Sequence, residues 1–248
     1  MPRFFINEES ISGGAAAIVG DDARHIARSL RMAVGDEITL ADGSGAEYTA
    51  KLTKIRDDIC EADIVSKRRS EGEPPSKITL FMAYPKSDKL ELVIQKAVEL
   101  GASRIVPFES ERCIKRPDES KAAARRVRHE RIAEEAAKQC GRAILPTVLA
   151  PISFTSMLGE AARCALVLFC YEGEGAVSLK AILSEHEGAP ESIAVIVGSE
   201  GGFSPAEAEA ARARGFRIAN LGARILRCET APDYVLSAIS YHFELKKG

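Results

Sequence analysis

Two short segments near the C-terminus carry glycines and charged side chains directly after predicted strands. The first is Gly198–Gly202, with the sequence GSEGG, which follows the apolar run Ile193–Val197. The second is Gly222–Cys228, which follows the short apolar run Phe216–Leu221. Between them, Ser204–Glu207 predicts a helix start with a capping box and a proline at the first helical position. Because open α/β sheets bind ligands at the carboxyl ends of their strands, the two segments together predict a ligand site.

Backbone amides in loops rich in glycine can approach a ligand closely and contact a flat ring or a carboxylate. Two familiar nucleotide-binding patterns are absent from the sequence of these loops, namely G-x-x-x-x-G-K-[ST] and G-x-G-x-x-G. Taken alone, either loop is more simply explained as a tight turn. The pair of loops is the more specific signal.

The stretches IVGSEGGFSPAE and LGARILRCETAPDYVLSAI resemble the signature of the SPOUT (α/β-knot) methyltransferases. Within that class the chain is similar to the family that methylates N3 of a uridine in small-subunit (16S) ribosomal RNA. The resemblance extends to Lys89–Cys113, to KQCGR at Lys138–Arg142 and to the opening MPRFFI, so it covers essentially the whole chain. In two places the chain departs from the family pattern: Ser199 stands where proline is usual, and Cys228 where threonine is usual.

The resemblance implies S-adenosyl-L-methionine (SAM) as the cofactor, with its adenosine among backbone groups of three loops at strand ends. Leu221, Ile225 and Leu226 would form apolar walls for the adenine, although burial in the core is the commoner fate of such side chains. The cofactor-binding residues implied are Leu168, Phe169, Gly198, Glu200, Gly201, Gly202, Leu221, Gly222, Ile225 and Leu226.

Methylation at N3 requires that the ring proton be accepted or that the resulting negative charge on the uracil oxygens be stabilised. None of the four histidines lies in the two loops. We therefore predict Arg227 as the cation that stabilises or positions the uracil. Glu229 is predicted as the proton acceptor or as the carboxylate that orients Arg227. The alternative for this pair is a structural ion pair at the start of the last helix.

The distribution of predicted elements indicates two domains, 1–72 and 73–248. In the first, apolar residues alternate with polar ones on both sides of the turn Asp42–Gly45, and one helix is expected near Asp22–Leu30. This pattern suggests a small β-barrel, and the resemblance implies a PUA-like RNA-binding domain. The polar segment Lys67–Ser76 is predicted to be the linker. Beyond it, strands alternate with helices, which predicts an α/β fold with a parallel sheet flanked by helices. The resemblance adds a deep trefoil knot.

The formal net charge of −2 gives no overall sign of a polyanion partner, and residues 1–75 hold ten Lys or Arg against fourteen Asp or Glu. RNA contacts must therefore be local. Residues 112–142 hold ten Lys or Arg and five Asp or Glu, which favours phosphate binding there. The alternative is a solvated helix stabilised by Glu/Arg pairs. The predicted RNA-binding residues are Arg3, Arg28, Arg31, Arg112 and Arg126.

The six cysteines form no C-x-x-C pair and there is no secretory leader, so we expect a reduced, cytoplasmic protein without a bound metal. No apolar run approaches the roughly 18 residues of a membrane span. The last helix, predicted at Pro232–Leu245, has an apolar face that predicts a homodimer. Two alternatives to the uridine methyltransferase remain: a 2′-O-methyltransferase of tRNA or large-subunit rRNA, and a non-catalytic RNA-binding assembly factor.

Overall fold

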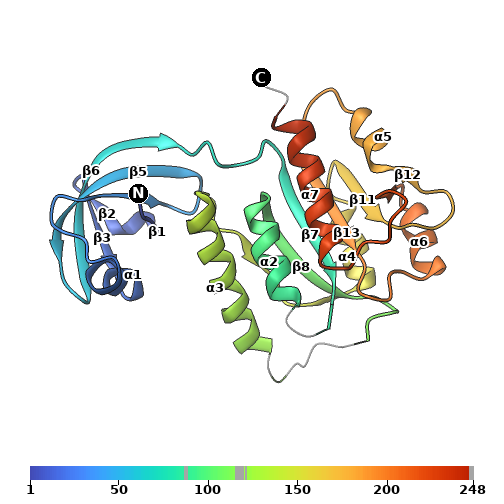
Figure 1. The fold of residues 1–248 in the computed structure, drawn as a ribbon, viewed down its shortest axis with the longest axis horizontal. Coiled ribbons are helices and arrows are strands. Elements are labelled where there is room, and N and C mark those ends of the chain that lie inside the picture. The colour runs from blue at the N-terminus through green and yellow to red at the C-terminus, as the bar shows by residue number, and fades with distance from the viewer. Residues whose placement is uncertain (87–88, 115–119, 121, 246–248) are drawn as a thin grey trace. The chain divides into compact units, whose positions relative to one another are not determined.

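The structure is a computed structural model, and it describes all residues except 87–88, 115–119, 121 and 246–248 (Figure 1). The chain forms two compact units. The first consists of Met1–Glu73 with Ala137–Leu145, and the second consists of Pro74–Ala136 with Pro146–Gly248.

The first unit is a curled, mixed six-stranded sheet in the order β1-β4-β5-β6-β3-β2 (Figure 1). The strands are β1 (Arg3–Phe5), β2 (Ile11–Ser12), β3 (Ala15–Val19), β4 (Glu37–Ala41), β5 (Ala46–Ile55) and β6 (Ile59–Arg69). Only β1 and β4 pair in parallel; the other described pairs are antiparallel. Helix α1 (Asp21–Arg24) and the π-helical turn His25–Ser29 pack Ala23 and Ile26 into the core of the curled sheet. The expected β-rich unit with one helical segment is confirmed, in the form of a half-barrel.

The hairpin between β4 and β5 forms where turn residues were predicted. The Asp42 carboxylate accepts hydrogen bonds from the amides of Ser44 (2.9 Å) and Ala46 (3.1 Å). Burial alone would raise the pKa of Asp42, but these bonds, the Ser44 hydroxyl and the nearby Lys67 lower it below its usual value. The turn is therefore fixed by the side chain of its first residue.

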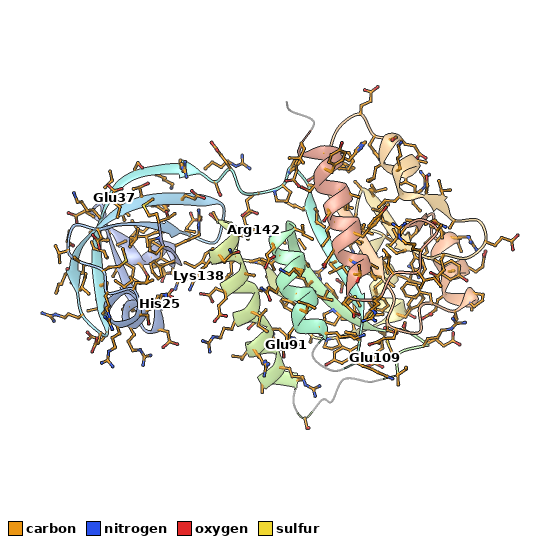
Figure 2. All side chains as sticks on the ribbon, viewed as in Figure 1. His25, Glu37, Glu91, Glu109, Lys138 and Arg142 are labelled. Atoms are coloured by element: carbon orange, nitrogen blue, oxygen red, sulfur yellow. The ribbon has the colours of Figure 1, made fainter. Side chains whose placement is uncertain are left out.

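The predicted linker at Lys67–Ser76 is wrong in its first part, because β6 continues to Arg69. Ser70 is buried and donates to the Glu47 carboxylate at 2.6 Å. Farther on, Glu73 accepts from the amides of Ala143 and Ile144, both at 2.9 Å. Arg142 (labelled in Figure 2) also contacts Glu73, at 2.7 Å. Sequence polarity suggested a linker here, but the polar groups have specific partners within the unit.

The second unit contains a parallel sheet in the order β10-β8-β7-β13-β11-β14-β12, with β9 beside β8. Its strands are β7 (Lys77–Ala83), β8 (Ala102–Glu109), β9 (Thr147–Val148), β10 (Ile152–Ser153), β11 (Leu166–Cys170), β12 (Val177–Ser178), β13 (Ser192–Val197) and β14 (Arg217–Asn220). The helices are α2 (Lys89–Glu99), α3 (Ala122–Cys140), α4 (Phe154–Ala161), α5 (Leu179–Ser184), α6 (Pro205–Arg212) and α7 (Thr230–Phe243). The end of α3, from Ala137, belongs to the first unit. The predicted α/β fold with a parallel sheet is confirmed, and the knot stays a prediction.

Helices cover both faces of this sheet. Alternate strand residues such as Phe169 and Ile196 share one apolar cluster with residues of α4 and α6. Because side chains alternate along a strand, Leu168 and Val195 point to the opposite face. Helix α7 packs against β13 of the same chain and also contacts α2 and α5. Both faces are needed to bury strands that are apolar along their whole length.

The apolar face of α7 is already buried within the chain. Val235, Leu236 and Ile239 are at most 2% exposed. No second subunit is therefore needed to bury this face, because neighbouring elements of the same chain cover it. None of the described helices is long and apolar enough to cross a membrane.

Candidate functional site

The candidate site lies at the carboxyl ends of three adjacent parallel strands. β13 pairs with β11, and β11 pairs with β14, so the loops that follow them begin side by side. They enclose a cavity of about 620 Å³, which is within the usual range of small-molecule sites. The lining residues are Lys89, Arg112, Cys170, Tyr171, Glu172, Gly173, Val197, Gly198, Ser199, Glu200, Gly201, Gly202, Phe203, Ala219, Leu221, Gly222, Arg224, Ile225, Leu226, Arg227, Cys228 and Ala231.

The loop between β13 and α6 is held at both of its ends. The Gly202 amide donates to the Ser199 carbonyl at 2.9 Å and closes a tight turn. The Phe203 ring packs on Phe169 with centroids 4.2 Å apart. Ser204 and Glu207 then form the predicted capping box, which is confirmed, with Pro205 at the first helical position. The backbone around the glycines is therefore fixed by its flanks.

Gly201 is required by close packing within the protein itself. A Cβ atom at this position would lie 2.9 Å from both the carbonyl oxygen and the Cβ of Arg112. Arg112, in the loop after β8, also donates from Nη1 to the Gly201 carbonyl at 3.3 Å. Arg112 therefore packs directly against the glycine loop, and part of the requirement for glycine at position 201 is structural.

The loop between β14 and α7 exposes apolar side chains to the cavity. Gly222 has φ of 114°, which an L residue rarely adopts, and its amide donates to Asn220 Oδ1 at 2.6 Å. Ile225 is 83% exposed although it is a large aliphatic residue. Leu221 and Leu226 are partly buried in the same lining. An apolar surface left uncovered inside a cavity is suited to a flat, largely apolar ring.

A cluster of charges joins two of these loops. Lys89 Nζ lies 3.1 Å from a Glu200 carboxylate oxygen and 3.1 Å from a Glu229 carboxylate oxygen. The hydrogen bonds that the Lys89 ammonium donates to Glu229 and then to Glu200 raise the pKa of Lys89. Burial alone would raise the pKa of Glu200, but its own amide, Lys89 and the Lys86 amide together lower it. The pKa of Glu229 is lowered, first by its own backbone amide. All three groups are therefore charged at neutral pH.

The cysteine beside this cluster is kept as a neutral thiol. Burial, followed by the hydrogen bond to Glu229, raises the pKa of Cys228 to about 12. Its Sγ lies 3.2 Å from a Glu229 oxygen and 3.8 Å from Lys89 Nζ. The Cys228 thiol thus donates a weak hydrogen bond to the Glu229 carboxylate.

The predicted cofactor residues fall into two groups. Gly198, Glu200, Gly201, Gly202, Leu221, Gly222, Ile225 and Leu226 line the cavity. Leu168 and Phe169 do not, because both are fully buried inside the sheet, and the lining on this side begins at Cys170 and continues to Gly173. The resemblance placed Leu168 and Phe169 in the loop, whereas both lie inside β11, which continues to Cys170.

The predicted pair of Arg227 and Glu229 does not form. Glu229 contacts Lys89, whereas Arg227 lines the cavity with its side chain exposed. Among the described residues, no partner to the Arg227 guanidinium is found. Lys89 was not identified as a site residue from the sequence. Lys89 begins α2, and only the order of the strands in the folded sheet brings that helix close to Glu200 and Glu229. A single sequence does not reveal that order.

The arginines predicted to bind RNA have different surroundings. Arg3 is 12% exposed at its side chain and pairs with Glu47 at 2.9 Å, so it serves the core of the first unit. Arg28 is exposed and pairs with Asp57, and Arg31 is exposed with φ of 51°. Arg112 lines the cavity. Arg126 of α3 is exposed and pairs with Glu130 one turn away. Of the basic stretch, residues 115–119 and 121 lie outside the described residues.

Known proteins resemble this chain along its full length. An RNA methyltransferase domain matches residues 72–240, and an RNA methyltransferase PUA domain matches residues 18–65. Ribosomal RNA small subunit methyltransferase E of Bacillus subtilis is 34% identical, with 100% of this chain and 99% of the relative covered. The crystal structure of the Neisseria gonorrhoeae protein of that name, bound to S-adenosyl methionine, is 33% identical, with a TM-score of 0.85 over 98% of each chain. A Legionella pneumophila structure in complex with SAM is 30% identical, with a TM-score of 0.84 over 96% of each chain.

Proposed function

We propose a function from one premise: the chain belongs to the ribosomal RNA small subunit methyltransferase E family, the SPOUT RNA methyltransferases with an N-terminal PUA domain. The protein is a SAM-dependent methyltransferase that acts on N3 of a uridine in small-subunit (16S) ribosomal RNA. The observation that carries this function is the likeness to the B. subtilis relative over the whole of both chains. The glycine-lined cavity at the strand ends is the site that this activity requires.

The residues of the cavity fit SAM in size and in chemistry. Its volume of about 620 Å³ suits a ligand of that size. We propose that Leu221, Ile225 and Leu226 contact the adenine, and that the backbone of Gly198–Gly202 contacts the rest of the cofactor. Leu168 and Phe169 support the site from inside the sheet. When bound, SAM supplies a methyl group activated by its sulfonium, so the protein's task is alignment and charge stabilisation.

Arg227 is proposed as the cation that faces the uracil. Its side chain is exposed at the cavity and no described residue neutralises it, so its charge is available to negative charge that develops on the uracil oxygens. Glu229 is a poor proton acceptor in this arrangement, because its pKa is lowered and its carboxylate is paired with Lys89. The proposed role of Glu229 is to position Lys89 and Cys228, the two side chains that it contacts.

RNA is proposed to bind through exposed arginines of both units. Arg112 lies at the cavity and Arg126 on α3, while Arg28 and Arg31 are exposed on the first unit. Arg3 is better explained as structural, because its side chain is 12% exposed and its partner Glu47 is 4% exposed, whereas the ion pairs of Arg28 and Arg126 are exposed. A homodimer and a cytoplasmic location remain part of the proposal. The homodimer now rests on the resemblance to the SPOUT class, whose members form homodimers, because the chain itself buries the apolar face of α7.

The test is methylation of RNA by the purified protein. Small-subunit particles and naked 16S rRNA from a strain lacking the gene are incubated with protein and SAM, and the nucleosides are identified by mass spectrometry. We expect 3-methyluridine in at least one of the two substrates. A 2′-O-methylated nucleoside instead would mean that the reaction is wrong, and absence of SAM binding by calorimetry would favour an assembly factor.

A further inference from the structure

Lys89 is the first residue of α2, and its ammonium group lies between two carboxylates of different loops. Glu200 belongs to the loop after β13, and Glu229 immediately precedes α7. Each has an oxygen 3.1 Å from Lys89 Nζ. One cation therefore joins three separate segments of the chain, and each of these segments contributes residues to the cavity wall.

The three charges are partly shielded from solvent. The side chains of Lys89, Glu200 and Glu229 are 34%, 24% and 18% exposed. Charges in such positions are screened less by water and salt than fully exposed pairs. Two carboxylates that share a cation repel each other when the cation is removed. Loss of the ammonium would thus drive the two loops apart.

The Glu200 end of this bridge has a second attachment. Its carboxylate oxygens accept from the Lys86 amide at 3.2 and 3.4 Å, so the segment before α2 is also tied to the glycine loop. The Glu229 end adds the neutral thiol of Cys228. The other charged residues of the cavity are Arg112, Glu172, Arg224 and Arg227. In the described part of the chain, none of these four contacts the Lys89 ammonium.

We infer that Lys89 is a positioning residue for SAM: it holds the Glu200 loop and the Glu229 loop at the separation that the cofactor requires. The inference rests on the proposed function, because it takes SAM as the occupant of the cavity. It assigns Lys89 no contact with the reacting atoms. Its effect passes through the two carboxylates.

This role predicts an unusual dependence on pH. In the native protein Lys89 helps to keep the pKa values of Glu200 and Glu229 low, so both stay ionised from pH 8 to pH 5.5. Without the cation, each carboxylate raises the pKa of the other. Lowering the pH then protonates one of them and relieves the repulsion. A variant that lacks the cation should therefore regain SAM affinity as the pH falls, relative to the native protein at the same pH.

The experiment measures SAM affinity of the full chain by titration calorimetry at pH 8 and pH 5.5. Lys89→Met keeps the length of the side chain and removes its charge, whereas Lys89→Arg keeps the charge. Lys54→Met is the matched control: it removes a lysine of similar exposure (40% against 34%) that is paired with Glu61 in the first unit and does not line the cavity. We expect Lys89→Met to weaken binding about tenfold at pH 8, within the range for coupled neighbouring groups. The deficit should shrink at pH 5.5, Lys89→Arg should restore most of the affinity, and Lys54→Met should match the native protein.

A double variant tests the route of the effect. Each single variant is expected to lower SAM affinity by some factor. If Lys89 acts through the carboxylates, the variant with both Lys89→Met and Glu229→Gln should lose less affinity than the product of those two factors. Native affinity in Lys89→Met at pH 8 would overturn the inference, as would an equal deficit at both pH values. If the native protein binds no SAM, both the inference and the proposed function fail. If it binds SAM and Lys89→Met binds equally well, only the inference fails.

Discussion

Replacement of Gly201 by alanine should loosen the glycine loop in a way that can be calculated from its packing. The new Cβ would lie 2.9 Å from the carbonyl oxygen and the Cβ of Arg112, whereas ordinary contact begins at 3.4 Å, so the two loops must separate by about 0.5 Å. Overpacking of this kind costs about 1–3 kcal/mol, and the lower entropy of the unfolded chain offsets about 0.4–1 kcal/mol. We therefore expect a net loss of roughly 1–2 kcal/mol in the free energy of unfolding, measured by urea denaturation.

SAM affinity should fall in the same variant, because the displaced backbone lines the cavity. Gly188→Ala is the matched control: it adds the same methyl group to a loop of the same unit, with no atom within 4 Å of the new Cβ. The control should keep its stability and its SAM affinity. If Gly201→Ala also keeps both, the contact with Arg112 yields at no cost, and the claim that it fixes the glycine loop is refuted.

Three further outcomes are expected. Arg227→Ala should leave the unfolding free energy and SAM affinity nearly unchanged, while the single-turnover methylation rate falls by about 10²–10³; an unchanged rate would remove Arg227 from the mechanism. Glu73→Gln should cost the protein about 1.5–3 kcal/mol in urea denaturation, because it replaces the charged acceptor of the buried Arg142 guanidinium with a neutral amide. Arg126→Ala should weaken RNA binding and reduce its salt slope by about one, as filter binding at several salt concentrations would measure. A slope equal to that of the native protein would mean that Arg126 touches no phosphate.

Local signals in the sequence predicted local structure well. The capping box at Ser204 and Glu207 depends on residues three apart, and the α/β pattern depends on runs within single elements, so both were visible without knowledge of the fold. The glycine loops also follow this rule. The resemblance to a family supplied what such signals lack, namely the identity of the ligand.

The errors came from interactions between residues far apart in the sequence. Glu229 was assigned to Arg227, its neighbour in the loop, but its partner is Lys89 of α2, which only the order of strands in the sheet brings close. Arg3 stays a predicted RNA contact, but its side chain is only 12% exposed and pairs with Glu47 of β5, which favours a structural role. Charge alone does not distinguish a free arginine from a paired one.

The pairing of Glu229 changes how the uridine proton must be handled. A general base is effective when its pKa lies near the working pH, and the pKa of Glu229 is lowered below the ordinary value for a carboxyl group. The cavity lining contains no histidine, and its cysteines, with pKa values raised by burial to about 12 for both Cys170 and Cys228, are neutral. Among the described residues, the cavity keeps positive charge without a carboxylate partner at Arg224 and Arg227. The site is therefore better suited to stabilise the uracil anion while its proton leaves to solvent than to abstract that proton directly. The arginines favour the negatively charged ring, and the described lining residues provide no base matched to the working pH.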